Sequence, residues 1–302
     1  MEERAMNFLF PLGAVLIWAV NSIVSKLSVG VITPEAISFY RWMLALLVLT
    51  PFVLPGVIRH RTALSREWLK LLILGALGMV LYQSLAYYAA RTVSALFIGI
   101  LIASIPLLTV IFSLFILRLT PTLGIVLGAV ISFAGLAWLI SDGHPQQLLS
   151  QGLGSGELMM IVAAAAYALY GVLTKRWSMD LPRWQSLYIQ ILFAVLMLLP
   201  GFLITPSVAL TAKNIPLVLY AAIAASIIAP YLWIQGVMRL GANTASIFLN
   251  LAPVFTAVIA ITCLHEKMHS WHWIGGSLTL AGVILAQRLR IPVGRRTGNK
   301  PR

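Results

Sequence analysis

Apolar runs of about 20 residues, separated by short polar stretches, fill most of the chain. A helix needs about 20 mostly apolar residues to cross a bilayer, whereas a barrel strand needs about half that length with alternating polarity. The pattern therefore predicts an all-α membrane protein with ten transmembrane helices. The ten predicted spans are Asn7–Leu27, Pro34–Leu54, Leu69–Tyr88, Ser94–Ile116, Pro121–Ser141, Gly156–Arg176, Arg183–Thr205, Ile215–Gly236, Asn243–Cys263 and Ser270–Arg288.

The second half of the chain repeats the pattern of the first. Pro106 lies at the centre of one long apolar run, and Pro253 lies at the centre of another, 147 residues later. The same offset links Thr109 with Thr256, Gly128 with Gly275, and Gly135 with Gly282. At an offset of 149, the segment WAVNSIVSK matches YALYGVLTK. Since each half has five spans, an odd number, the second copy enters the membrane from the opposite side, and the halves are predicted to be inverted repeats.

The longest polar stretch between spans divides the chain near its middle. It reads DGHPQQLLSQGLGS and contains no Lys or Arg, so we expect it on the outer side. The predicted organisation is a first repeat over 1–141, an extracytoplasmic linker over 142–155, a second repeat over 156–289 and a basic cytoplasmic tail over 290–302.

The composition agrees with a surface that faces lipid. Charged residues make up only 10% of the chain and hydrophobic ones 60%, whereas a soluble domain has about 25% charged residues. The net charge of +13 does not indicate nucleic-acid binding, because the basic residues sit between the apolar runs. With the N-terminus inside, sixteen of the 21 basic residues flank inner span ends and four flank outer ends, while Arg41 lies within a span. This asymmetry predicts cytoplasmic termini in an inner membrane.

Other features narrow the class further. The single cysteine, Cys263, cannot form an intrachain disulfide. Glu2 and Glu3 do not suit the start of a signal peptide, so the first run is expected to be a retained span. No cofactor is expected. The expected partners are a small-molecule substrate and the lipid bilayer, and the sequence is compatible with a monomer or a dimer.

Several of these features together resemble a known family. Two five-helix halves, a proline in the fourth helix of each, and the Glu266-Lys267 pair after the ninth span resemble the drug/metabolite transporter superfamily, and within it the EamA-type transporters. The resemblance covers about residues 7–289. It implies a secondary transporter of the bacterial inner membrane, often an exporter of amino acids or other metabolites, with a cavity lined by the first, third and fourth helices of each half. The glutamate often found after the fourth helix is absent, since that region reads Leu117-Arg118-Leu119-Thr120.

Aromatic, hydroxyl and amide side chains gather near the middle of several spans. In the first and sixth spans they recur at spacings of three and four, which places them on one helical face. Such groups need partners that a substrate can supply, although lipid-facing or packing aromatic residues are the simpler alternative. The predicted substrate-binding residues are Trp18, Asn21, Gln83, Tyr87, Tyr167, Tyr170, Tyr231, Trp233 and Asn250, with Tyr82 and Ser226 nearby on the third and eighth spans. The set suits a neutral or aromatic amino acid as the substrate. A quaternary-amine drug or a lipid is an alternative substrate, because aromatic rings also bind cations through cation–π contact.

Four charged residues are candidates for a gate or an ion pair. Arg41 lies deepest, about 10 Å along its helix at a rise of about 1.5 Å per residue, and no buried acid is evident as its partner. Lys26 and Lys175 end matched helices, where snorkelling to the interface is the simpler alternative. Glu266 is expected to hold the corner between the ninth and tenth spans, with Lys267 as its suggested partner. No acid lies near a helix centre, which weakens a proton-coupled mechanism.

Two further patterns concern the shape of the bundle. Pro106 and Pro253 each remove one helical hydrogen bond and are predicted to be hinges, with a static kink as the alternative. Gly124, Gly128 and Ser132 form a small-residue stripe that allows close approach of the fifth and tenth helices.

The segment His265-Glu266-Lys267-Met268-His269 matches H-E-x-x-H, a zinc-protease signature. That chemistry needs both histidines on one helical face and the glutamate as base. Asp142, His144 and Glu157 were conceivable third ligands. The membrane protease is therefore a remote alternative, and no metal site is expected.

The sequence as a whole predicts a secondary transporter, not an enzyme, that moves a small metabolite by alternating access. Neutral or aromatic amino acids in the export direction are favoured, with proton-coupled uptake or drug efflux as the alternatives.

Overall fold

The computed structural model describes residues 2–146, 152–206, 208–240, 245, 248–289 and 291. These residues are almost entirely helical. The elements of the first half are α1 (Glu2–Leu27), α2 (Pro34–Arg59), α3 (Arg61–Arg66), α4 (Trp68–Gly75), the π-helical η1 (Ala76–Leu81), α5 (Tyr82–Ala89), α6 (Ala95–Ile102), α7 (Ile105–Ile116) and α8 (Leu123–Ile140). Those of the second half are α10 (Ser155–Trp177), α11 (Arg183–Ile204), α12 (Ile215–Leu219), the π-helical η2 (Tyr220–Ile228), α13 (Ala229–Leu240), α15 (Ala252–Leu264) and α16 (Ser270–Arg288).

The all-α membrane architecture is confirmed. By length and hydropathy, eight helical stretches among the described residues are suited to cross a membrane. The helix α15 is shorter, with 13 residues, because a turn at Asn250 and Leu251 separates it from the helical residues before it. The count of ten spans stays a prediction. Residues 147–151 of the predicted linker and nearly all of the predicted basic tail lie outside the described residues.

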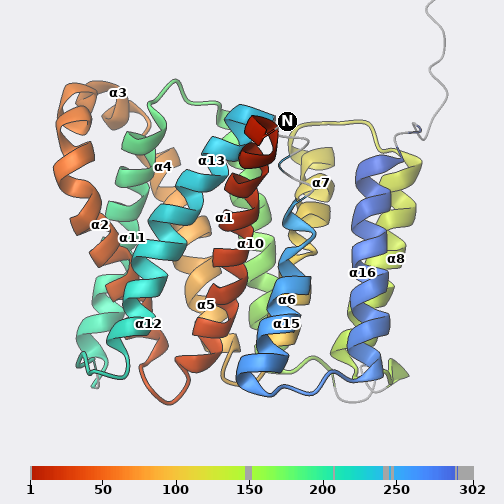
Figure 1. The fold of residues 1–302 in the computed structure, drawn as a ribbon. Helices are drawn as coiled ribbons and strands as arrows, with labels where there is room; N and C mark the ends of the chain where they lie inside the picture. Colours follow the sequence, from red (N-terminus) through yellow and green to blue (C-terminus); the bar gives the residue numbers. More distant parts are fainter. Residues whose placement is uncertain are drawn as a thin grey trace, which may run out of the picture.

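The two halves run in opposite directions through the bundle. The end of α1 reaches the beginning of α6, because Lys26 donates hydrogen bonds to the carbonyls of Ala90 and Val93. The end of α10 instead reaches the end of α7, because Arg176 donates to the carbonyl of Ile116 at 3.0 Å. Since α6 and α7 form one pass, the matched helices α1 and α10 end at opposite faces. Figure 1 shows the beginning of α1 and the end of α16 at one face, which we call the terminal face; the other is the distal face.

Glycines join α8 and α16 into a closely packed pair, which stands at one side of the bundle (Figure 1). A Cβ at Gly128 would lie 2.4 Å from the carbonyl oxygen of Gly282, and a Cβ at Gly135 would lie 2.7 Å from that of Gly275. The predicted packing of these helices is confirmed. At the offset of 147, Gly275 is the counterpart of Gly128 and Gly282 is the counterpart of Gly135. The two contacts are therefore equivalent under the internal symmetry. The pseudo-twofold axis therefore passes between these two helices.

The fourth helix of the first half is broken at its proline. The sequence predicted one helix over Ser94–Ile116, but α6 ends at Ile102 and α7 begins at Ile105. Pro106 thus occupies the first turn of a new helix, where its missing N–H costs nothing. Pro253 has the same position at the start of α15. The kinks expected at both prolines are confirmed as helix breaks.

The third helix of each half contains a π-helical segment, and the two segments lie at matching positions, η1 over Ala76–Leu81 and η2 over Tyr220–Ile228. In η1 the N–H of Tyr82 donates to the carbonyl of Leu77, five residues earlier. Such segments are rare and are frequent at functional sites. Sequence reasoning gave ordinary helices here.

Candidate functional site

A buried arginine lies where the two halves meet. Arg41 on α2 is only 2% exposed. Its Nε donates to Ser226 Oγ at 2.7 Å, and its Nη1 donates to Gln83 Oε1 at 2.8 Å and Tyr87 Oη at 3.2 Å. A longer contact of 3.4 Å joins Nη1 to Asn21 Oδ1. Helices α1, α2 and α5 of the first half and η2 of the second therefore converge on one guanidinium group.

All of these partners are neutral. The ion pair found among the described residues joins Lys70 and Glu67 at the surface, and no described carboxylate lies within ion-pair distance of Arg41. Removing a cation from water costs several kcal/mol, which hydrogen bonds to neutral groups offset only in part. The described bonds use Nε and Nη1 but not Nη2. The guanidinium can therefore accept an anionic partner.

Local structure fixes the position of this group. Ser226 lies in η2, and its hydroxyl donates to the carbonyl of Ala221, five residues earlier, which orients its oxygen toward Arg41. The indole ring of Trp42 lies 5.0 Å from the guanidinium carbon. Trp42 is itself held by a hydrogen bond from Nε1 to the carbonyl of Met79 in η1. The segment η2 thus holds Arg41 directly through Ser226, and η1 holds it indirectly through Trp42.

Two groups of aromatic rings flank the arginine site. The rings of Trp18 and Trp233 lie 5.7 Å apart between α1 and α13. Those of Tyr82 and Tyr167 lie 4.5 Å apart between α5 and α10, and Tyr170 lies 5.6 Å from Tyr167. Trp18 and Tyr167 match at the offset of 149. The first helix of each half therefore packs an aromatic ring against the third helix of the other half.

Some predicted site residues lie elsewhere. Tyr231 is 46% exposed and its nearest aromatic neighbour is Trp184, at 6.5 Å. Asn250 borders a separate hollow between α15 and the end of α16. The other residues around this hollow are Phe248, Leu251, Ile284, Gln287 and Arg288. Of the predicted residues, the structure therefore brings Asn21, Gln83 and Tyr87 into contact with Arg41. It packs Trp18 with Trp233 and Tyr167 with Tyr170, and it places Tyr231 and Asn250 elsewhere.

The charged residues at the helix ends differ in their surroundings. Lys26 is half-buried and bonds to backbone carbonyls, whereas its counterpart Lys175 is exposed. Glu266 accepts hydrogen bonds from the N–H groups of Ala95 and Leu96 at the start of α6. The expected pairing of Glu266 with Lys267 was therefore wrong, because the carboxylate binds the unsatisfied amides of a helix N-terminus instead.

The segment with the H-E-x-x-H letters does not form the zinc-binding geometry. It occupies the connection between α15 and α16, where His265 has a left-handed φ of 53° and His269 precedes the first turn of α16. The two histidines therefore do not share a helical face. Among the described residues, no three His, Cys, Asp or Glu side chains form a group that could hold a metal ion.

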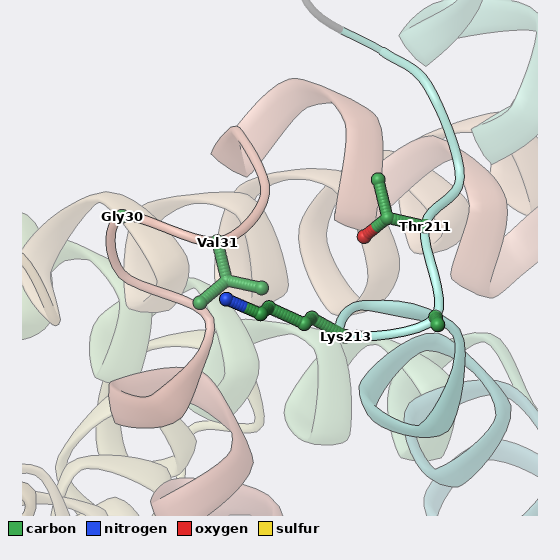
Figure 2. A pocket seen from close by; sticks show the side chains of 5 residues that line it. Gly30, Val31, Thr211 and Lys213 are labelled. Carbon is green, nitrogen blue, oxygen red and sulfur yellow. The ribbon is translucent and has the colours of Figure 1, made fainter.

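A recess at the distal face, shown in Figure 2, lies between the loop after α1 and the segment before α12. Gly30 and Val31 line one side, and Thr211, Ala212 and Lys213 line the other. The Lys213 side chain extends toward Val31 (Figure 2). None of the predicted site residues lines this recess.

The most informative contacts of the site could not be found from sequence. The partners of Lys26 and Glu266 are backbone groups of apolar residues, and no side-chain pattern marks them. The two π-helical segments also could not be predicted from the sequence, although they lie at matching positions in the two halves.

Comparisons with known proteins agree with this architecture. The profile of the EamA-like transporter family matches residues 6–141 and again residues 154–287. The uncharacterised transporter YyaM of Bacillus subtilis is 27% identical over 275 residues, which is 89% of each chain. A probable terminal-alkyne amino-acid exporter of Streptantibioticus cattleyicolor is 28% identical over 250 residues, 80% of this chain and 78% of that one. One crystal structure shares the fold with a TM-score of 0.60 and 20% identity, covering 93% of this chain and 95% of the other.

Proposed function

Because the chain belongs to the EamA-like transporter family, we propose that it exports small amino-acid metabolites, neutral or aromatic, across the inner membrane by alternating access. The name of the Streptantibioticus relative supports an amino-acid substrate. The distribution of basic residues supports an orientation with the terminal face toward the cytoplasm.

One observation carries the substrate class: Arg41 is buried and surrounded by neutral partners. A carboxylate would complete its coordination through the bidentate geometry that guanidinium groups favour. The contact with Asn21 is the longest of the four, so it is the one that a carboxylate would most easily replace. Asn21 and Gln83 are half-buried, whereas Arg41 and Tyr87 are buried, which places the two amides on the accessible side of the arginine.

The aromatic rings support the choice of side chain. Trp18, Trp233, Tyr82 and Tyr167 offer flat apolar surfaces on both sides of the pseudo-twofold axis. A ring or an apolar side chain gains burial against such surfaces. A cationic drug would instead meet the charge of Arg41 in a poorly solvated place, and so cations are disfavoured.

The acidic residues favour a facilitative carrier. All eight lie in the first turn of a helix or in connecting segments, and none lies at the middle of a span. A proton-coupled carrier generally has a titratable group in the membrane. We therefore expect transport in proteoliposomes that does not require a pH gradient.

The test compares each amino acid with its methyl ester, which lacks the carboxylate. In proteoliposomes, the intact carrier should prefer phenylalanine over the ester by about 100-fold, the value of a strong charge-assisted hydrogen bond. In Arg41→Gln this ratio should fall toward about one, and Arg41→Lys should keep part of it. Arg59→Gln, an exposed position near the end of the same helix, serves as the matched control.

If Arg41→Gln lowered the transport of the amino acid and of its methyl ester equally, the arginine would only stabilise the bundle. Transport of quaternary amines in preference to amino acids would overturn the proposed substrate class. Accumulation that depends on a pH gradient would replace the facilitative mechanism with a coupled one.

A further inference from the structure

The turn that joins α5 to α6 is held by two charged side chains from elsewhere in the chain. Lys26, at the end of α1, donates from Nζ to the carbonyls of Ala90 at 2.9 Å and Val93 at 2.7 Å. These carbonyls lie just after α5. A helix C-terminus carries partial negative charge, so the ammonium group suits it.

The opposite charge holds the other end of the turn. Glu266 accepts from the N–H of Ala95 at 2.8 Å with Oε1 and from that of Leu96 at 3.0 Å with Oε2. These amides open α6, where the helix dipole favours an anion. We call Lys26, Glu266 and residues 90–96 the charged clasp. It ties α1 and the connection from α15 to α16 onto one turn of the distal face.

Under the clasp, three helices are sealed together by apolar side chains. Ile23 of α1, Ala95 and Leu96 of α6, and Ala260 of α15 form one buried cluster. Further along α6, a Cβ at Gly99 would lie 2.7 Å from the side chain of Thr256 on α15. The distal ends of α1, α6 and α15 thus leave no open path between them.

The matched positions at the terminal face have different surroundings. Ser25 is 3% exposed, whereas its counterpart Thr174 is exposed, although both hydroxyls donate to the carbonyl four residues earlier. Lys175, the counterpart of Lys26, is also exposed. At the offset of 147, the counterpart of Glu266 is Leu119, which is 49% exposed. The acid half of a second clasp is therefore missing.

From this asymmetry we infer that the charged clasp is the lock of the distal face, and that the empty carrier rests open toward the terminal face. Lys26 and Glu266 act as positioning residues, since they touch backbone ends and not the arginine site. Releasing them lets α6 separate from α1 and α15 and opens the distal face. The inference rests on the alternating access of the proposed function, but it holds for any substrate.

The test uses a matched pair of single-cysteine reporters. After Cys263→Ser removes the one native cysteine, Ser25→Cys reports on the distal face and Thr174→Cys reports on the terminal face. A membrane-impermeant maleimide is applied to oriented vesicles from either side, without substrate. The readout therefore does not depend on whether the proposed substrate is right.

With the clasp intact, Ser25→Cys should react slowly and Thr174→Cys quickly. Adding Glu266→Ala or Lys26→Ala should raise labelling of Ser25→Cys about tenfold and lower that of Thr174→Cys, since the two faces open alternately. Lys26→Arg should restore the original rates. Lys175→Ala, the symmetry-matched control, should change neither. Unchanged labelling of Ser25→Cys, or an equal rise at both reporters, would overturn the proposal and leave the clasp as an ordinary helix cap.

A variant that adds an acid tests the proposal even if Glu266→Ala and Lys26→Ala fail to fold. Leu119→Glu supplies the missing acid at an exposed position, where substitution is well tolerated. It should slow labelling of Thr174→Cys and speed that of Ser25→Cys. No change at either reporter, in a carrier that inserts normally, would show that the acid does not bias the two faces and would overturn the lock.

Discussion

The two halves of this carrier share a scaffold but differ in their charges. The glycine contacts between α8 and α16 and the π-helical segments recur at matching positions. The central charge does not recur. Pro34 begins α2 and Pro182 directly precedes α11, an offset of 148, which makes Ile189 the counterpart of Arg41.

This difference separates what the repeat must keep from what it can vary. Matching backbones give the two open states similar energies, as alternating access requires. The proposed substrate has one carboxylate and needs only one cation, and Arg41 of the first half is oriented by Ser226 of the second. The single acid of the clasp, Glu266, likewise acts at one face only. In the proposed mechanism, symmetry therefore accounts for the movement, and asymmetry accounts for recognition and for the resting state.

The largest effect is expected from breaking the shared scaffold. In Gly128→Leu the new side chain meets the rigid backbone at Gly282, and overpacking of this kind costs about 3 kcal/mol. The apparent Tm of the detergent-solubilised protein should fall by about 5 to 10 °C. Gly282→Leu should do the same, because the two glycines face each other. Gly171→Leu is the control, since nothing lies within 4 Å of its Cβ position, and its Tm should stay within about 2 °C. A similar loss in all three variants would contradict the specific role of this contact.

A smaller effect is expected from the aromatic rings that the halves share. Tyr167→Ala removes a ring from α10 and should lower the preference for phenylalanine over alanine about tenfold, the worth of one well-packed ring contact. Tyr167→Phe keeps the ring and should keep the preference. Asn250→Ala should also keep it, because Asn250 borders the other hollow. Selectivity that survives Tyr167→Ala and is lost in Asn250→Ala would move the substrate site to α15 and α16.

Much of the fold follows from the sequence because its signals are long and periodic. Apolar runs of membrane length predicted the spans, and the offset of 147 predicted the inverted repeats. The small-residue stripe of Gly124, Gly128 and Ser132 predicted the packing of α8 on α16. The two prolines marked the helix breaks, since proline cannot continue a helix without losing a hydrogen bond. Arg41 stood out because a charge at that depth is rare.

The site was harder to predict because its contacts join distant elements. Asn21, Gln83 and Ser226 meet only when three helices pack around α2, and sequence spacing does not encode that meeting. The partners of Lys26 and Glu266 are backbone groups, which every residue has. Tyr231 and Asn250 were included by depth in the membrane, but depth does not tell which way a side chain points.

The smallest effect is expected at the paired helix breaks, which occur in both halves. Pro106→Ala and Pro253→Ala each restore a backbone N–H and allow the broken helix to extend across the break. If the breaks are hinges, the maximal transport rate should fall about two- to fivefold while the half-saturation concentration stays unchanged, because the hinge limits reorientation and not binding. Pro51→Ala, at an exposed position within α2, should change neither. A raised half-saturation concentration with an unchanged maximal rate would mean that the prolines shape the site and do not act as hinges. An effect at only one of the two prolines would contradict the prediction for the other and would show that the halves move unequally.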